Sequence, residues 1–293
     1  MKSRSLPPVL LGLLIALALS LYALQSRQPV PSYALDSLPP YSGEPAVTLD
    51  ENRPDFPDTD KTSQAFERYS QLDYFGRCGP AYANVGPETM PTGERESIWE
   101  VKPSGWQTAK YDFVDGNSLY NRCHLIGWQL TGENANELNL ITGTRYFNVQ
   151  GMLPYENQVA DYVKKTGNHV LYRVTPLYHE GDLVAHGVEM EALSVEDGGT
   201  GVCFHVYAYN VQPGVVIDYA TGLSWLEGED PPGPETPAPE GGPSYVLNTG
   251  SMRFHLPSCS GAKDMKPDNR RDYTGSRQAL LDEGYVPCGT CKP

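Results

Sequence analysis

The stretch Tyr120-Asn121-Arg122-Cys123-His124-Leu125-Ile126-Gly127 is the part of the sequence that most constrains the fold and the chemistry. Before Val159 three further groups follow: Asn139-Leu140-Ile141-Thr142, Asn148-Val149-Gln150-Gly151 and Tyr155-Glu156-Asn157-Gln158. An arginine beside a histidine, followed by asparagines and a glutamate, suits phosphodiester hydrolysis. That reaction needs a base that titrates near neutral pH. It also needs positive charge at phosphorus, which a hard cation with few protein ligands supplies.

Asn121-Arg122-Cys123-His124 resembles the Asp-Arg-Gly-His motif of the DNA/RNA non-specific endonucleases, the ββα-metal nucleases. The resemblance covers residues 75 to 225 and is nearest to exported, DNA-entry-type enzymes. It implies an α+β fold with a central antiparallel sheet flanked by helices.

The same resemblance assigns roles to individual residues. His124 would be the general base and Arg122 the motif arginine. Asn148 would be the sole direct protein ligand of a Mg²⁺ or Mn²⁺ ion. Asn139 would help to position the phosphate or the base, and Glu156 would hold metal-bound water.

Two positions depart from the motif. Asn121 replaces an aspartate and loses its charge, and Cys123 replaces a glycine, so the backbone there must accept a Cβ atom. Neither change removes a group that performs chemistry. Taken singly, Asn-Arg-x-His is more typical of a surface loop, Asn139 of a turn and Glu156 of a solvated helix. The ordered combination favours the catalytic interpretation.

Local patterns place these residues in a mixed domain at 61–226. Three apolar stretches, at 170–178, 183–193 and 202–209, alternate with turn-like sequences and predict an antiparallel meander. Before them, Pro154 to Lys165 has a helical apolar face and is followed by the stop signal Gly167-Asn168. The order of elements indicates the α+β class.

Residues 1–30 form a targeting segment, because Lys2 and Arg4 precede an apolar run from Val9 to Leu24. It is either a cleaved signal peptide or an uncleaved membrane anchor. Leu21-Tyr22-Ala23 is a poor cleavage site, which favours the anchor. Either way the rest of the chain is expected outside the cytoplasm, secreted or bound to the membrane.

Two acidic, proline-rich segments are predicted to be spacers. Residues 31–60 carry one basic and seven acidic residues without apolar periodicity. Residues 227–243 carry five acidic residues and no basic ones, and their prolines favour a semi-rigid linker.

The last segment, 244–293, has the spacing of a zinc site. His255-x3-Cys259 and Cys288-x2-Cys291 supply four ligands for tetrahedral Zn²⁺. Tyr245, Val246, Leu247, Leu280 and Leu281 form too small a core to fold fifty residues unaided. The segment resembles the Ada-type zinc-binding domain, with His255 in place of a cysteine. The alternative is a Cys288–Cys291 disulfide with Cys259 free.

The other cysteines are Cys78, Cys123 and Cys203, for which export permits a disulfide. Three single pairings are open, and a bridge from Cys123 to Cys203 or Cys78 would clamp the active-site loop.

Charge argues against simple nucleic-acid affinity. The chain has a formal net charge of −14, whereas phosphate binding comes mostly from Lys and Arg. Residues 61–226 have 11 basic and 19 acidic residues, and 244–293 have 7 and 5.

Two functions are therefore weighed. One is a metal-dependent endonuclease that acts on DNA, with RNA as a second candidate substrate. The other is a catalytically weak, envelope-tethered nucleic-acid-binding protein. The basic zinc module would hold nucleic acid near the enzyme, or dock to a cell-wall polymer or another protein. A toxin nuclease is a third reading.

Overall fold

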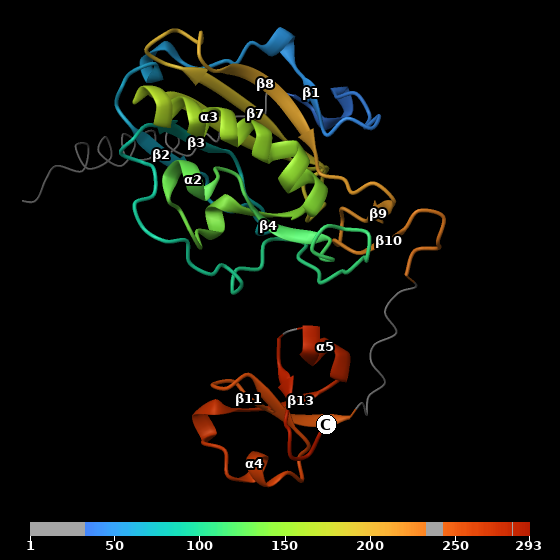
Figure 1. Ribbon diagram of the computed structural model, residues 1–293. Coiled ribbons are helices and arrows are strands. Elements are labelled where there is room, and N and C mark those ends of the chain that lie inside the picture. Colours follow the sequence, from blue (N-terminus) through green and yellow to red (C-terminus); the bar gives the residue numbers. More distant parts are fainter. Residues whose placement is uncertain (1–32, 233–242, 283) are drawn as a thin grey trace, which may run out of the picture. The chain divides into compact units, whose positions relative to one another are not determined.

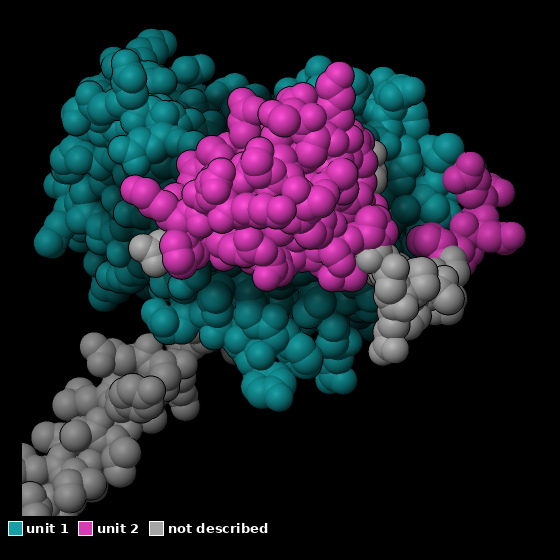
Figure 2. Space-filling view, turned by 90° about the horizontal axis from the view of Figure 1, so that it is seen from below, with its two compact units in different colours: residues 1–227 teal, residues 228–293 magenta. Residues whose placement is uncertain are grey.

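The computed structural model describes residues 33–232, 243–282 and 284–293, which form the two compact units coloured in Figure 2. Unit 1 spans Met1–Glu227 and unit 2 spans Gly228–Pro293. The targeting segment predicted at residues 1–30 lies outside the described residues. Within the described ranges, no helix is both long and apolar enough to span a bilayer.

Unit 1 is built mainly of β-strands, with one long helix (Figure 1). Its strands are β1 (Ala46–Thr48), β2 (Phe66–Tyr69), β3 (Ala81–Val85), β4 (Tyr120–His124), β5 (Leu140–Thr144), β6 (Val170–Leu177), β7 (Gly187–Ser194), β8 (Cys203–Tyr209), β9 (Val215–Ile217) and β10 (Ser224–Leu226). Its helical segments are α2 (Trp128–Thr131), α3 (Leu153–Thr166), a π-helical segment (Phe147–Met152) and four 3-10 turns (Leu35–Ser37, Asp50–Asn52, Asp58–Asp60 and Glu137–Asn139).

The main sheet of unit 1 is antiparallel, in the strand order β1-β8-β7-β6-β3-β2. The predicted meander is confirmed as β6, β7 and β8, and the predicted helix as α3. Alternate residues of the strands, such as Val188 and Met190, join α3 residues Val159 and Val163 in one apolar core. The α+β class with a central antiparallel sheet is confirmed.

A separate hairpin carries the motif residues. β4 pairs with β5 in antiparallel register, with His124 opposite Leu140. The chain then enters the π-helical segment and α3, whose first residues follow without a break. This strand–strand–helix unit brings the end of β4 and the start of α3 to one place, because the hairpin turns the chain back on itself.

The predicted spacer at 31–60 is wrong for residues 33–60, which we call the strap. Its strand β1 pairs with β8, and its Leu49 and Phe56 are only 6% and 3% exposed. The Arg173 guanidinium donates to the Asp55 carbonyl at 2.8 Å and to Glu191 at 2.7 Å. The strap therefore covers the sheet face opposite α3. Its apolar residues are isolated, so they leave no periodic signal in the sequence.

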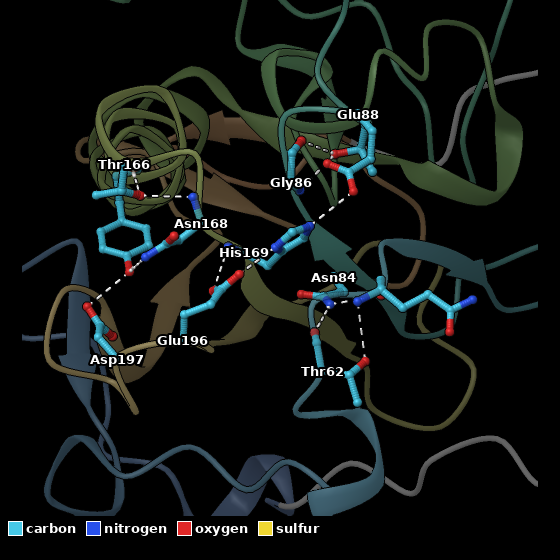
Figure 3. A network of polar contacts seen from close by, with 12 residues as sticks. Thr62, Asn84, Gly86, Glu88, Thr166, Asn168, His169, Glu196 and Asp197 are labelled. Carbon is cyan, nitrogen blue, oxygen red and sulfur yellow. Dashed lines mark hydrogen bonds and ion pairs between the residues drawn. The ribbon is translucent and has the colours of Figure 1, made fainter.

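A second polar network ties three turns of unit 1 together (Figure 3). His169, just before β6, lies between two carboxylates. Its Nδ1 is 2.7 Å from Glu196 and its Nε2 is 3.0 Å from Glu88. Burial alone would lower the pKa of His169, but hydrogen bonds to Glu196 and Glu88 outweigh it and raise this pKa. The hydrogen bond to His169 lowers the pKa of Glu88.

These opposed shifts predict a pH window for unit 1. A raised histidine pKa contributes stability that is complete below the ordinary value of 6.5 and is lost as pH rises through the folded pKa. A lowered glutamate pKa contributes stability above the ordinary value of 4.5 that is lost on acidification. The difference in free energy of unfolding between wild type and His169→Gln should therefore be largest between pH 4.5 and pH 6.5. Tryptophan fluorescence during urea unfolding measures it, because all four tryptophans lie in unit 1. A difference that stays constant up to pH 9 would contradict the assignment.

Unit 2 has a four-stranded sheet in the order β13-β11-β12-β14. Its elements are β11 (Ser244–Asn248), β12 (Arg253–His255), α4 (Ser260–Lys263), a 3-10 turn (Pro267–Asn269), β13 (Arg270–Thr274), α5 (Arg277–Asp282) and β14 (Val286–Pro287). Along β11, Tyr245 and Leu247 join one apolar cluster, and Val246 joins another with Cys259 and Cys288. Both clusters are small, which agrees with the small core predicted for this segment.

All six cysteines are free thiols, so the structure does not contain the disulfide suggested for unit 1. Cys123 points into the core beneath α3, where it is fully buried beside Phe147 and over Gly143. Cys203 is exposed and lies on the face of β8 that meets the strap, where its thiol contacts the Asn52 carbonyl. The sheet separates these two sulfur atoms, which excludes their pairing. Cys78 donates instead to the carbonyls of Glu137 and Leu140.

Candidate active site

A cleft of about 620 Å³ opens where the β4–β5 hairpin meets α3. Of the residues predicted for the nuclease site, four line it, and Asn139 does not. The four are Arg122, His124, Asn148 and Glu156. Strand alternation in β4 directs Arg122 and His124 to the cleft while Cys123 between them faces the core, and Asn121 also lines the cleft.

The His124 imidazole is held in its neutral form. It is 6% exposed, and its Nε2 lies 2.8 Å from the carbonyl oxygen of Asn134. A carbonyl can only accept a hydrogen bond, so Nε2 carries the proton and the lone pair is on Nδ1. Burial lowers the pKa of His124 below its ordinary value, and the nearby Arg95 acts in the same direction. The ring is therefore ready to accept a proton at neutral pH.

Asn148 and Glu156 offer oxygen atoms to the same cleft. The Asn148 amide makes no side-chain hydrogen bond to any described residue. Glu156 is almost fully buried, and burial raises the pKa of its carboxyl to about 8, against a smaller opposite effect of Arg95. Gly127 makes room for this carboxylate, since a Cβ atom on Gly127 would lie 2.7 Å from a Glu156 oxygen. A nearby cation would favour the ionised form of this carboxyl, which burial disfavours, and the Asn148 amide oxygen beside it is free, so the pair fits a hard cation and its water.

The motif arginine has a different immediate task. The Arg122 guanidinium donates to the backbone carbonyls of Val101 and Trp99, and it lies 4.0 Å from the Trp106 ring centroid. Arg122 therefore anchors the loop before β4, and fewer of its donors remain for a phosphate.

Sequence reasoning missed two other arginines of the cleft. Arg145 lines it and is held by Asp115 at 2.7 Å. Arg95 lines it without a hydrogen bond or ion pair to any residue in the described ranges. Arg95 lies in a loop with no regular pattern, so only its place in the folded chain identifies it as the cation free to contact a phosphate.

Asn139 acts through the backbone. It is fully buried, its Oδ1 accepts from the Ile126 N–H at 2.9 Å, and its Nδ2 donates to the Ile126 carbonyl at 2.9 Å. This paired contact fixes the turn that follows His124. Asn139 therefore contacts the backbone next to His124 and does not line the cleft.

Asn139→Ala should destabilise unit 1, because it leaves both backbone groups of Ile126 buried without partners. Each such group costs about 1–3 kcal/mol. Urea unfolding followed by tryptophan fluorescence measures the loss. Asn157→Ala is the matched control, since that amide makes only an exposed hydrogen bond to Gln129. Equal stability of the two variants would rule out this role.

In unit 2 the four predicted zinc ligands converge. His255, Cys259, Cys288 and Cys291 each offer an atom within 4.8 Å of the others. The Nδ1 of His255 is buried without a hydrogen-bond partner. Backbone N–H groups of Cys291 and Thr290 lower the pKa of Cys288 to about 6, so its thiolate, the zinc-binding form, is present at neutral pH. Gly261 leaves space beside the imidazole, as a Cβ atom there would lie 3.0 Å from the ring.

Comparison with known proteins finds similarity to nucleases. Residues 58–196 match the family model described as DNA/RNA non-specific endonuclease. Similar solved structures include NucA from Streptococcus agalactiae with a magnesium ion bound, with a TM-score of 0.57 and 28% identity over 66% of this chain and 92% of that chain. NucA from the same organism with no metal bound has a TM-score of 0.56, with the same identity and coverage. The search of curated proteins found no significant match.

Proposed function

We propose that this chain is a metal-dependent endonuclease that hydrolyses phosphodiester bonds of DNA without sequence specificity, with RNA as a second candidate substrate. The observation that carries the proposal is the convergence of His124, Asn148 and Glu156 on one cleft. The family match over residues 58–196 and the likeness to NucA support nuclease activity.

In the proposed reaction His124 takes a proton from the attacking water through Nδ1. Its Nε2–H stays bonded to the Asn134 carbonyl, which holds the ring in the competent tautomer and spreads the charge it gains. Asn139 keeps the following turn in place. Arg95 is the side chain placed to contact a phosphate oxygen, because it has no protein partner among the described residues.

The Asn148 amide oxygen would hold a Mg²⁺ or Mn²⁺ ion, and the Glu156 carboxylate would hold its water. Such an ion supplies charge stabilisation at the phosphate and the leaving oxygen. Magnesium is bound in one of the similar NucA structures, which supports this choice. The free Asn148 amide and the buried Glu156 carboxyl are the features of this chain that fit it.

Degradation of plasmid DNA by the full chain tests the proposal. Mg²⁺ should support cleavage, EDTA should stop it, and Mg²⁺ added back should restore it. The alternative, a nucleic-acid-binding protein without catalysis, predicts a retarded but intact plasmid under all three conditions. RNA offered under the same conditions tests the second substrate.

Asn148→Ala should lose most activity at low Mg²⁺ and recover part of it at high Mg²⁺, because water and phosphate fill most of the remaining coordination shell. Glu156→Ala should show the same trend more weakly, since it would act through water. The measurement is the initial rate against Mg²⁺ concentration. Gln150→Ala changes an exposed amide of the same segment and is the matched control. An Asn148→Ala curve that overlays wild type would assign the ligand to another residue.

Unit 2 is proposed to be a zinc-stabilised module with His255, Cys259, Cys288 and Cys291 as ligands. Their proximity and the orphan Nδ1 of His255 support this. Retention of nucleic acid and docking to a cell-wall polymer or protein both stay predictions for this unit. Export, whether with a membrane anchor or by secretion, rests on residues 1–30 alone.

A further inference from the structure

The cleft offers few free positive charges to bind the phosphates of a duplex. Of its three arginines, Arg122 is engaged by backbone carbonyls and Arg145 by Asp115, which leaves Arg95. Glu94 and Glu96 flank Arg95 in the sequence and are exposed. Binding along a duplex backbone gains its affinity from many cations, each of which neutralises a phosphate. The cationic side chains of the cleft alone therefore offer a duplex little affinity, and another kind of side-chain contact can contribute to substrate binding.

An indole side chain is available for that contact. Trp128 begins α2 and lines the cleft directly after Gly127, the residue that faces the Glu156 carboxylate. The Trp128 side chain is only half-buried. Within the part of the chain that the structure describes, it belongs to no apolar cluster and makes no ring or cation–π contact. The neighbouring Trp106, by contrast, packs on the Leu119–Tyr120 cluster and is covered by Arg122.

We propose that Trp128 is a stacking platform for a nucleobase beside the scissile phosphate, and that the enzyme consequently selects unpaired nucleotides. This inference rests on the proposed nuclease function and names its preferred substrate class. A base inside a duplex already has both faces stacked. The indole can stack on it only after the base is unstacked, which costs free energy. An unpaired base offers its face without that cost, and aromatic stacking does not depend on its identity.

The first measurement compares kcat/KM on a single-stranded oligonucleotide and on a hairpin duplex of the same sequence. Trp128→Ala should lower kcat/KM on the single strand by roughly 5- to 100-fold, which is the usual effect of removing one stacked aromatic. The value of kcat/KM on the duplex should fall less, so the preference for the single strand should shrink. Trp128→Phe should keep most of that preference, because phenylalanine can still stack. The matched control is Trp99→Ala, which removes a 55% exposed tryptophan whose side chain does not line the cleft.

The decisive measurement is a coupling between protein and substrate. On a strand in which an abasic residue replaces the base beside the single cleavable phosphate, wild type should lose as much kcat/KM as Trp128→Ala loses on the intact strand. Trp128→Ala should show little further loss on that abasic strand, because the contact is already gone. Independent losses that multiply would overturn the stacking proposal, as would a single-strand preference that Trp128→Ala leaves intact.

Failure of the nuclease function would look different. Wild type would then cleave none of these substrates with Mg²⁺. In that case stacking is measured as the quenching of tryptophan fluorescence when the full chain is titrated with single-stranded DNA. Trp128→Phe should remove most of the quenching that wild type shows, and Trp99→Phe should not. Equal quenching in wild type and Trp128→Phe would reject the platform.

Discussion

His124→Ala is expected to lower the rate of DNA cleavage by roughly 10²–10⁴-fold, the usual effect of removing a positioned general base. The variant should stay folded, since among the described residues the imidazole bonds only to backbone of the adjacent loop, at Asn134 and Glu133. The truncated side chain leaves space for a small base, so added imidazole should restore part of the rate. Initial rates on plasmid DNA at saturating Mg²⁺ give the measurement.

The pH profile separates a chemical from a structural role for His124. Because its pKa is lowered, the wild-type base form persists below the ordinary histidine range, and at saturating Mg²⁺ loss of this base form should lower the rate as pH drops through that lowered pKa. The residual activity of His124→Ala should lack this acid limb. His179→Ala removes a half-exposed histidine outside the cleft and is the control. Wild-type activity in His124→Ala would remove His124 from the mechanism.

Removal of zinc should unfold unit 2 while unit 1 stays folded. In zinc-finger peptides the apparent free energy of metal binding is about 10–16 kcal/mol and is itself folding free energy. The two apolar clusters of unit 2, built on Tyr245 and Val246, cannot replace that contribution. The full chain should bind one zinc through His255 and the three cysteines. Chelation should then make those three thiols reactive towards an alkylating reagent.

Two controls make the zinc result specific. Tryptophan fluorescence reports unit 1 alone and should not change on chelation. Cys203→Ser removes an exposed thiol of unit 1 and should leave the zinc content at one per chain, whereas Cys288→Ser should reduce it. A Cys288–Cys291 disulfide would instead protect two thiols with or without metal and leave Cys259 reactive. That pattern would exclude the zinc site.

Short-range patterns were sufficient for the parts of this protein whose signal lies within a few residues. Alternation predicted β6, β7 and β8, and the helical face followed by Gly167 predicted α3. The spacing His255-x3-Cys259 and Cys288-x2-Cys291 indicated four ligands that do converge. The order of His124, Asn148 and Glu156 likewise identified three residues of one cleft. The strand, helix and zinc-ligand signals depend on periodicity or on residue type at local spacing, whereas His124, Asn148 and Glu156 were identified through the resemblance to a nuclease family.

The remaining features depend on contacts between residues far apart in the chain. The strap shows no periodicity, yet its Asp55 carbonyl binds Arg173, 118 positions later. Arg122 and Asn139 bear the residue types of a catalytic site, but the fold directs them to backbone groups of Val101 and Ile126. The sequence determined which elements form and which chemistry is present. Only the tertiary structure decided which polar side chains are hydrogen-bonded within the protein and which are free to contact a substrate. The reason is that a hydrogen bond to distant backbone cannot be recognised from the neighbouring residues in the sequence.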